Sequence, residues 1–171
     1  MMGGVEFPKI VSGGQTGADR AALDWAMAHG VPHGGWCPAG RLAEDGVIDM
    51  RYSLKETPQP EYLQRTEWNV RDSDATLIVS CAAELAGGSL TTRDLAAAYD
   101  RPCLHLSGEL EAAEAAVLVR DWLQDEAVTV LNIAGPRASG EPAVGVFIQS
   151  ILDELWRHWE YPAPDLLDAV A

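Results

Sequence analysis

Three glycine-bearing segments of this 171-residue chain have the composition of anion-binding loops. They are residues 12–20 (SGGQTGADR), 87–94 (GGSLTTRD) and 135–140 (GPRASG). Each follows a short apolar run and precedes a helical pattern. Glycine lets the backbone come close to a ligand, and free amides at the start of a helix attract anions. The three segments therefore predict a binding site for a phosphorylated small molecule.

Individual residues of these segments are candidates for contact with the ligand. None of the segments is a Walker loop or a G-x-G-x-x-G dinucleotide fingerprint, so the pattern alone does not identify the ligand. The alternative is an ordinary helix cap, formed by Thr16 or Asp19 in the first segment and by Ser89 or Thr91 in the second. The candidate binding residues are Gly13, Gly14, Gln15, Thr16, Gly17, Gly87, Gly88, Ser89, Thr91 and Arg137.

Side chains outside the glycine segments could complete the site. Trp36 could stack on a planar ring, and Arg41 and Arg65 could bring positive charge to a phosphate. Plainer alternatives stay open, because Trp36 could pack beneath its loop and Arg65 could be a solvated helix residue. The formal net charge of −14 requires either that the basic residues gather at the site or that backbone amides bind the anion.

The elements that must position these residues alternate between strand and helix. The hydrophobic pattern predicts strands at 9–12, 33–37, 75–80, 103–106 and 128–133, and helices at 18–29, 62–71, 91–99, 111–124 and 142–159. The stretch between 41 and 59 predicts a long, partly extended loop. This alternation predicts an α/β fold, a Rossmann-like three-layer αβα sandwich with a mostly parallel sheet. Ligands of such sheets bind beyond the carboxyl ends of the strands, where the strand order reverses.

Length, charge and cysteine content narrow the class of protein further. The length predicts a single domain over 1–171, with a core at about 9–157 and a C-terminal tail at 160–171. The negative charge argues against nucleic acid or a membrane surface as partner. No apolar run could span a bilayer and residues 1–8 lack the pattern of a signal peptide, so we expect a cytoplasmic protein. Three cysteines without paired spacing predict neither a disulfide framework nor a metal site.

Five runs together resemble one protein family closely. They are SGGQTGADRAALDWA, GGWCPAGRLAEDG, YLQRTEWNVRDSDATLIV, GGSLTT and NIAGPRASG, and they span roughly residues 9–157. They resemble the molybdenum cofactor carrier family. The resemblance implies a Rossmann-like homo-oligomer, dimer or tetramer. It also implies that the ligand is molybdenum cofactor, a phosphorylated pterin dithiolene, or a related phosphorylated heterocycle such as a nucleotide. Trp156 and Trp159 could serve a subunit interface or pack in the core.

A more distant resemblance offers an enzymatic alternative. Residues 65–94 resemble the core of the cytokinin-activating phosphoribohydrolases, whose PGGxGTxxE motif aligns with AGGSLTTRD at 86–94. Arg65 and Asp74 keep the nine-residue spacing of that family, and Asp94 stands where the catalytic glutamate would be. This resemblance implies a nucleoside-5′-monophosphate phosphoribohydrolase with Asp94 and Arg65 as catalytic residues. A carboxylate there would stabilise positive charge on the ribose or activate water. The hydrolase requires Asp94 and Arg65 to converge near Gly13, whereas a binding protein does not.

Overall fold

One parallel sheet organises the chain, and the computed structural model describes residues 5–160 of it. The sheet has five strands in the order β2-β1-β9-β7-β8, and every neighbouring pair is parallel. Its strands are β1 (Lys9–Val11), β2 (His33–Gly34), β7 (Ala75–Ser80), β8 (Cys103–Ser107) and β9 (Val130–Ala134). The helices are α1 (Ala18–Ala28), α2 (Tyr62–Arg71), α3 (Gly87–Ala98), α4 (Ala112–Asp125) and α5 (Val144–Glu160). Within the described range, no helix is both long and apolar enough to cross a membrane.

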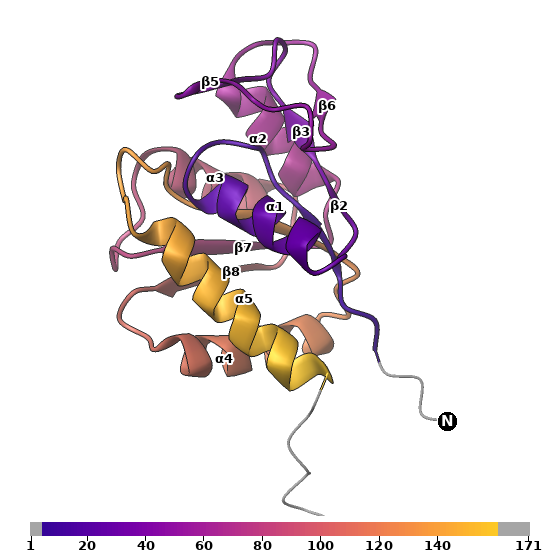
Figure 1. Cartoon of the computed structure of the whole chain (residues 1–171), viewed down its shortest axis with the longest axis vertical. Coiled ribbons are helices and arrows are strands. Elements are labelled where there is room, and N and C mark those ends of the chain that lie inside the picture. Colours follow the sequence, from indigo (N-terminus) through magenta and orange to yellow (C-terminus); the bar gives the residue numbers. More distant parts are fainter. Residues whose placement is uncertain (1–4, 161–171) are drawn as a thin grey trace, which may run out of the picture.

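Helices cover both faces of this sheet (Figure 1). Every residue of β7 is buried, and because side chains alternate along a strand, this burial requires a layer on each face. Leu77 and Val79 pack into the main core with α1, α4 and α5. Thr76 and Ile78 point to the opposite face, where α3 packs on the strand and α2 packs beside α3. The Rossmann-like α/β fold predicted from the alternation of strands and helices is confirmed.

The chain leaves the sheet earlier than predicted after β2. The predicted strand at 33–37 is interrupted at Gly35, whose φ is +130° and whose missing Cβ would overlap the backbone of Ser12. The following β3 (Trp36–Cys37) pairs instead with β6 (Lys55–Glu56), away from the central sheet. A short antiparallel hairpin of β4 (Leu42–Ala43) and β5 (Gly46–Val47) lies between these two strands in the sequence. The predicted long loop therefore contains the short strands β4, β5 and β6, which pair outside the central sheet.

The second glycine segment is also different from its prediction. Helix α3 begins at Gly87 rather than at Thr91, so Gly87, Gly88 and Ser89 form the first helical turn instead of a preceding loop. The bounds of α2 and β7 agree with the prediction at both ends, and those of β1, β8, β9, α1, α4 and α5 lie within two residues of it. The predicted C-terminal tail lies, beyond Glu160, outside the described residues.

The two tryptophans of α5 pack against the start of the chain. Phe7 meets the rings of Trp156 and Trp159 edge-on, with centroids 5.2 Å away in both cases. Trp25 of α1 lies 5.6 Å from the ring of Trp156. The indole of Trp159 donates a hydrogen bond to the carbonyl oxygen of Val5 at 2.7 Å. These contacts give both residues a packing role, while the oligomeric state stays a prediction.

Asp74, at the turn from α2 into β7, ties together the starts of two strands. Its Oδ2 accepts hydrogen bonds from the amide and hydroxyl of Thr129 and from the amide of Val130, at 2.8–2.9 Å. Burial acts to raise the pKa of Asp74, but these hydrogen bonds outweigh it and hold the pKa below its usual value. The interaction therefore stabilises the fold only while Asp74 is ionised.

Replacing Asp74 with asparagine should lower the free energy of unfolding by about 1–2 kcal/mol at pH 7. Because the pKa is depressed in the folded state, the stabilisation is complete above the unfolded pKa of about 3.9. It is lost as the pH falls through the folded pKa. Urea denaturation of both proteins between pH 7 and pH 3 measures this, with the exposed Glu109→Gln as control. A difference that stays constant down to pH 3 would contradict the assignment.

Candidate functional site

A cavity of about 320 Å³ opens at the carboxyl ends of β1 and β9. The chain runs from β1 outward to β2, and later occupies the other side of β1 with β9, β7 and β8, so this is where the strand order reverses. All three glycine segments contribute to the wall, through Gly13, through Gly87–Ser89 and through Gly135–Arg137. The structure therefore brings together three segments that are far apart in the sequence.

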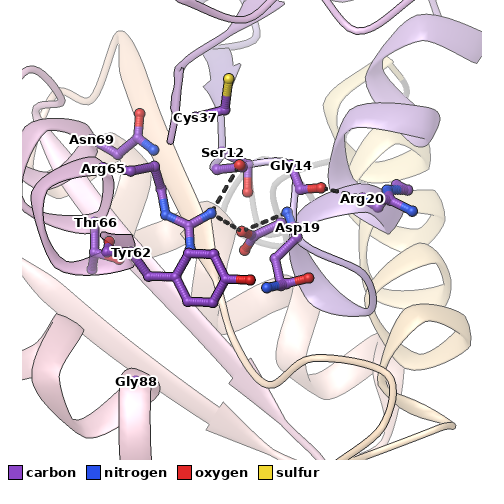
Figure 2. Close-up of polar contacts among 12 residues, drawn as sticks. Ser12, Gly14, Asp19, Arg20, Cys37, Tyr62, Arg65, Thr66, Asn69 and Gly88 are labelled. Atoms are coloured by element: carbon purple, nitrogen blue, oxygen red, sulfur yellow. Dashed lines mark hydrogen bonds and ion pairs between the residues drawn. The ribbon is translucent and has the colours of Figure 1, made fainter. Parts of the chain in front are cut away.

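One face of α2 forms the remaining wall of the cavity. Four residues of α2 line the cavity, namely Tyr62, Arg65, Thr66 and Asn69. The last three follow Tyr62 by three, four and seven positions, a spacing that places all four on one side of the helix. Arg65 points from α2 toward α1, as Figure 2 shows, and its Nη1 donates to the carbonyl oxygen of Gly13 at 2.9 Å. A Cβ on Gly13 would overlap the Arg65 guanidinium. Glycine at this position is thus what allows Arg65 to reach the sheet edge.

Arg65 also forms a buried ion pair with Asp19 on the first turn of α1. Its Nη1 lies 3.6 Å from Oδ2 of Asp19, and the two side chains are 9% and 12% exposed. Burial is the main influence on Asp19 and raises the pKa of its carboxyl, although Arg65 and the Gln15 amide favour the ionised form. The pair places a positive and a negative group side by side (Figure 2), and both residues line the cavity.

Two buried donors in the wall of this cavity have no partner among the described residues. They are Nε2 of Gln15 and Nε of Arg65, and both residues line the cavity. Buried N–H groups are rarely left without an acceptor, because each such group costs about 1–3 kcal/mol. Gln15 and Arg65 therefore each leave one donor unused beside the cavity.

The start of α3 adds a second set of donors. Its N-cap is Ala86, which has no side chain to bond the first-turn amides, and Gly87, Gly88 and Ser89 all line the cavity. The helix dipole makes this end favourable for an anion. Thr92 also lines the cavity, whereas the Thr91 hydroxyl bonds back to the Gly87 carbonyl oxygen and Thr91 does not line it.

Tyr62 provides the aromatic surface of the cavity. The guanidinium carbons of Arg65 and Arg137 lie 5.2 and 5.4 Å from the centre of its ring. The analysis of the sequence did not single out Tyr62. The available signal was its position three residues before Arg65 on a predicted helix, which puts both side chains on one face.

The first glycine segment uses most of its amides internally. The amide of Gln15 donates to Asp19, that of Thr16 to Oε1 of Gln15, and that of Ala18 to the carbonyl oxygen of Pro136. The Thr16 hydroxyl is hydrogen-bonded to Glu44 and accepts from the Ala138 amide. Gly14, Thr16 and Gly17 accordingly do not line the cavity. The Thr16 hydroxyl and the Ala18 amide instead bond the loop after β9, and of the predicted cradle only Gly13 and Gln15 line the cavity.

Arg41 has a different role from the predicted phosphate contact. Its guanidinium is buried and donates to the carbonyl oxygens of Ile48, Asp49, Tyr52 and Leu54 at 2.8–3.3 Å. It does not line the cavity. A single arginine thus joins four backbone acceptors of the loop between β5 and β6, in addition to the backbone hydrogen bonds that the Asp49 and Tyr52 oxygens accept.

Trp36 and Asp94 also lie away from the cavity. Trp36 follows the chain out of the sheet after Gly35, and its indole donates to Asp72 at 2.8 Å. Asp94 is exposed on α3 and does not line the cavity that Arg65 enters. The convergence that the hydrolase alternative requires is absent among the described residues, so the geometry does not favour that alternative.

The fold and the site define a Rossmann-like α/β protein with a small-molecule cavity at the switch point of its parallel sheet. Residues 10–156 match the circularly permutated YpsA SLOG family, and the chain belongs to that family. A solved structure of a "putative molybdenum carrier protein" from Syntrophus aciditrophicus SB is 46% identical and superposes with a TM-score of 0.87. The match covers 90% of this chain and 97% of that one. The family resemblance is confirmed, while the curated proteins contain no match.

Proposed function

We propose that this protein binds and carries molybdenum cofactor, or a closely related phosphorylated heterocycle, in the cavity at the ends of β1 and β9. The observation that carries the proposal is the pair of unpartnered buried donors, Gln15 Nε2 and Arg65 Nε, beside the uncapped start of α3. A phosphorylated ligand would supply acceptors to all of them. The solved relative is named a molybdenum carrier, which favours this ligand over others of the same chemistry.

The wall of the cavity suggests how such a ligand would lie. Its phosphate would sit at the first turn of α3, where Gly88, Ser89 and Arg137 converge with the helix dipole. Its flat ring would lie against Tyr62. None of the three cysteines lines the cavity, so in this proposal the protein recognises the phosphate and the ring, and molybdenum stays bound to the ligand's own sulfur atoms.

The setting of this activity is part of the same proposal. We place it in the cytoplasm, where the cofactor would be held between its synthesis and its insertion into an enzyme. A homodimer or homotetramer is the expected assembly. Neither nucleic acid nor a membrane surface is an expected partner of a chain with a net charge of −14.

An anaerobic titration of the full chain with isolated molybdenum cofactor, followed by pterin absorbance, tests the proposal. Saturable binding with a dissociation constant on the order of 1 μM or below is expected. Arg137→Gln should weaken it about tenfold because one charged donor is lost. Arg120→Gln, at a half-buried arginine on α4 that does not line the cavity, is the matched control and should leave it unchanged.

A parallel incubation with AMP tests the enzymatic alternative. The carrier predicts no release of adenine, and it predicts that Asp94→Asn binds the cofactor as the unchanged protein does. Adenine release that disappears in Asp94→Asn would instead establish a phosphoribohydrolase and overturn the carrier.

A further inference from the structure

A second cavity, of about 390 Å³, lies along β1 and β2 and reaches the start of β9. Lys9 and Val130 line it at the starts of β1 and β9, and His33 and Gly34 of β2 line it at the sheet edge. Asn69 contributes to the walls of both cavities, and its amide hydrogen-bonds the backbone of Trp36, so it stands between them. The proposed function uses no part of this second cavity.

Both lysines of the chain line this one cavity. Lys9 and Lys55 are the only lysines among the 171 residues, and the chain as a whole has a net charge of −14. Neither ammonium group forms an ion pair with any residue in the described range. Two unpaired cations in one cavity of a strongly acidic protein are the charge pattern of an anion site.

The acidic residue in the wall does not cancel this charge. Asp72 accepts hydrogen bonds from Nε and Nη2 of Arg71, at 2.8 and 3.0 Å, and from the indole of Trp36. The bond from Arg71 is the main reason why the pKa of Asp72 lies below its usual value. Its charge is therefore already compensated by Arg71, and the lysines remain available.

His33 supplies a polar atom without a partner. Its Nδ1 lies 3.3 Å from the carbonyl oxygen of Val31, and its Nε2 is buried and unpartnered among the described residues. With Nδ1 donating to that carbonyl, Nε2 can accept from the hydroxyl of an acidic group or, in a protonated ring, donate to its oxygen.

Trp36 gives the cavity a fixed aromatic wall. Its indole is held by the bond to Asp72 and by edge-on packing against Trp68, with ring centroids 4.7 Å apart. The Lys55 ammonium lies 5.7 Å from the centre of the Trp36 ring. A flat ring with an acidic substituent would meet an indole and a cation together, which is a favourable arrangement for both of its parts.

We infer that the cavity between β1, β2 and Trp36 is a second binding site, which takes a small planar organic anion with its phosphate or carboxylate group at Lys9 and Lys55. The ring of the ligand packs against Trp36, and Val11 and Val130 supply the apolar part of the wall. The inference is independent of the proposed function, because the two cavities have separate donors.

Gly34 provides a way to fill this cavity without straining the backbone. Its φ is not positive, and a Cβ built on it would lie 3.6 Å from the Lys9 Nζ and 3.7 Å from the Ser53 carbonyl oxygen, which is ordinary van der Waals contact. Gly34 pairs with Val11 in the parallel ladder, where a β-branched residue is well suited. Gly34→Val should therefore occupy the cavity and leave the sheet intact.

Titration of the ¹⁵N-labelled full chain with phenyl phosphate tests the inference through the indole N–H signal of Trp36, assigned with Trp36→Phe. We expect a saturable shift that weakens about tenfold in Lys9→Gln and in Lys55→Gln and disappears in Gly34→Val. Arg120→Gln, which removes a distant positive charge, and Arg137→Gln, in the first cavity, should leave the shift unchanged. Benzoate in a parallel titration shows whether phosphate or carboxylate is preferred, and saturable binding of either supports the site.

Three results would overturn the inference. The first is a shift that grows linearly without saturation, and the second is an affinity in both lysine variants equal to that of the unchanged protein. The third is loss of the shift in Arg137→Gln, which would mean that the probe binds in the first cavity. Inorganic phosphate that binds as tightly as phenyl phosphate would exclude the contact between the ring and Trp36. Since cofactor binding is measured separately, either site can fail while the other stands.

Discussion

Arg65→Gln should weaken ligand binding by about a hundredfold or more and lower the free energy of unfolding by about 3–5 kcal/mol. It is the largest effect we expect from one substitution, because Arg65 serves the ligand and the fold at once. The change removes the unpartnered Nε of a residue that lines the cavity, and it leaves the buried carboxyl of Asp19 without its cation. The pKa of Asp19, already raised by burial, should then rise further, and the loss of stability should be greatest at neutral and higher pH. Urea denaturation at several pH values and the cofactor titration measure the two effects.

Two companion variants separate the contributions of Arg65. In the double variant Arg65→Gln/Asp19→Asn no unpaired charge is buried, so stability should largely return while binding stays weak. Arg71→Gln removes a more exposed arginine from the same helix and should change the free energy of unfolding by less than about 0.5 kcal/mol. Recovery of full ligand affinity in the double variant would contradict the role of Arg65 in binding.

Arg41→Met should lower the free energy of unfolding by about 3 kcal/mol or more while leaving the cavity able to bind its ligand within a few-fold. The substitution leaves the carbonyl oxygens of Ile48, Asp49, Tyr52 and Leu54 without the donor that now joins them. Hydrogen exchange should accelerate between residues 41 and 57. The amides of β7 should exchange only through global unfolding, at a rate set by the free energy of unfolding.

The matched control for Arg41 is Arg51→Met in the same loop. Arg51 is exposed and bonds the Tyr52 hydroxyl rather than the backbone, so its loss should change stability by less than about 1 kcal/mol. If Arg41→Met kept its stability and lost ligand affinity instead, the buried arginine would be a ligand contact as the sequence suggested, and the structural role assigned here would be wrong.

The central layer of the fold was predictable because its signals are local. ATLIVS at 75–80 is an uninterrupted apolar and β-branched run, and it forms β7 with those bounds. The amphipathic pattern at 62–71 likewise forms α2. When strands and helices alternate, the right-handed crossovers between parallel strands and the packing of helices on both faces leave few possible topologies. The position of the cavity at the switch point follows from that topology.

The residues around the cavity were predictable only in part, because partners distant in sequence decide their roles. Thr16 has the type and place of a phosphate ligand, yet Glu44 and Ala138 occupy its hydroxyl. Trp36 lies away from the site because the chain turns at Gly35, which packs directly against the Ser12 backbone. No local pattern reports the contact with Glu44 or the crowding at Ser12, so the roles of Thr16 and Trp36 could not be predicted from the sequence around them.

The start of α3 shows a different limit of prediction. Two consecutive glycines have low helix propensity, so the sequence favours a loop at 87–89. The structure nevertheless begins the helix at Gly87, with no side-chain cap. Tertiary packing of Ser89, Thr92 and Ala96 against the sheet outweighs the local preference, since these three residues are the buried ones of the helix. The consequence is that the first turn of a helix, rather than a loop, lines the cavity.

The most direct test of the carrier is native mass spectrometry of the full chain, purified without oxygen from two hosts. One host makes molybdenum cofactor, and the other is the same strain with that synthesis blocked. The account predicts an added mass containing molybdenum and a phosphorylated pterin in the first preparation, its absence in the second, and its absence in Arg65→Gln/Asp19→Asn from either. A chain that carries no such mass, or one that carries the same nucleotide from both hosts, would contradict it.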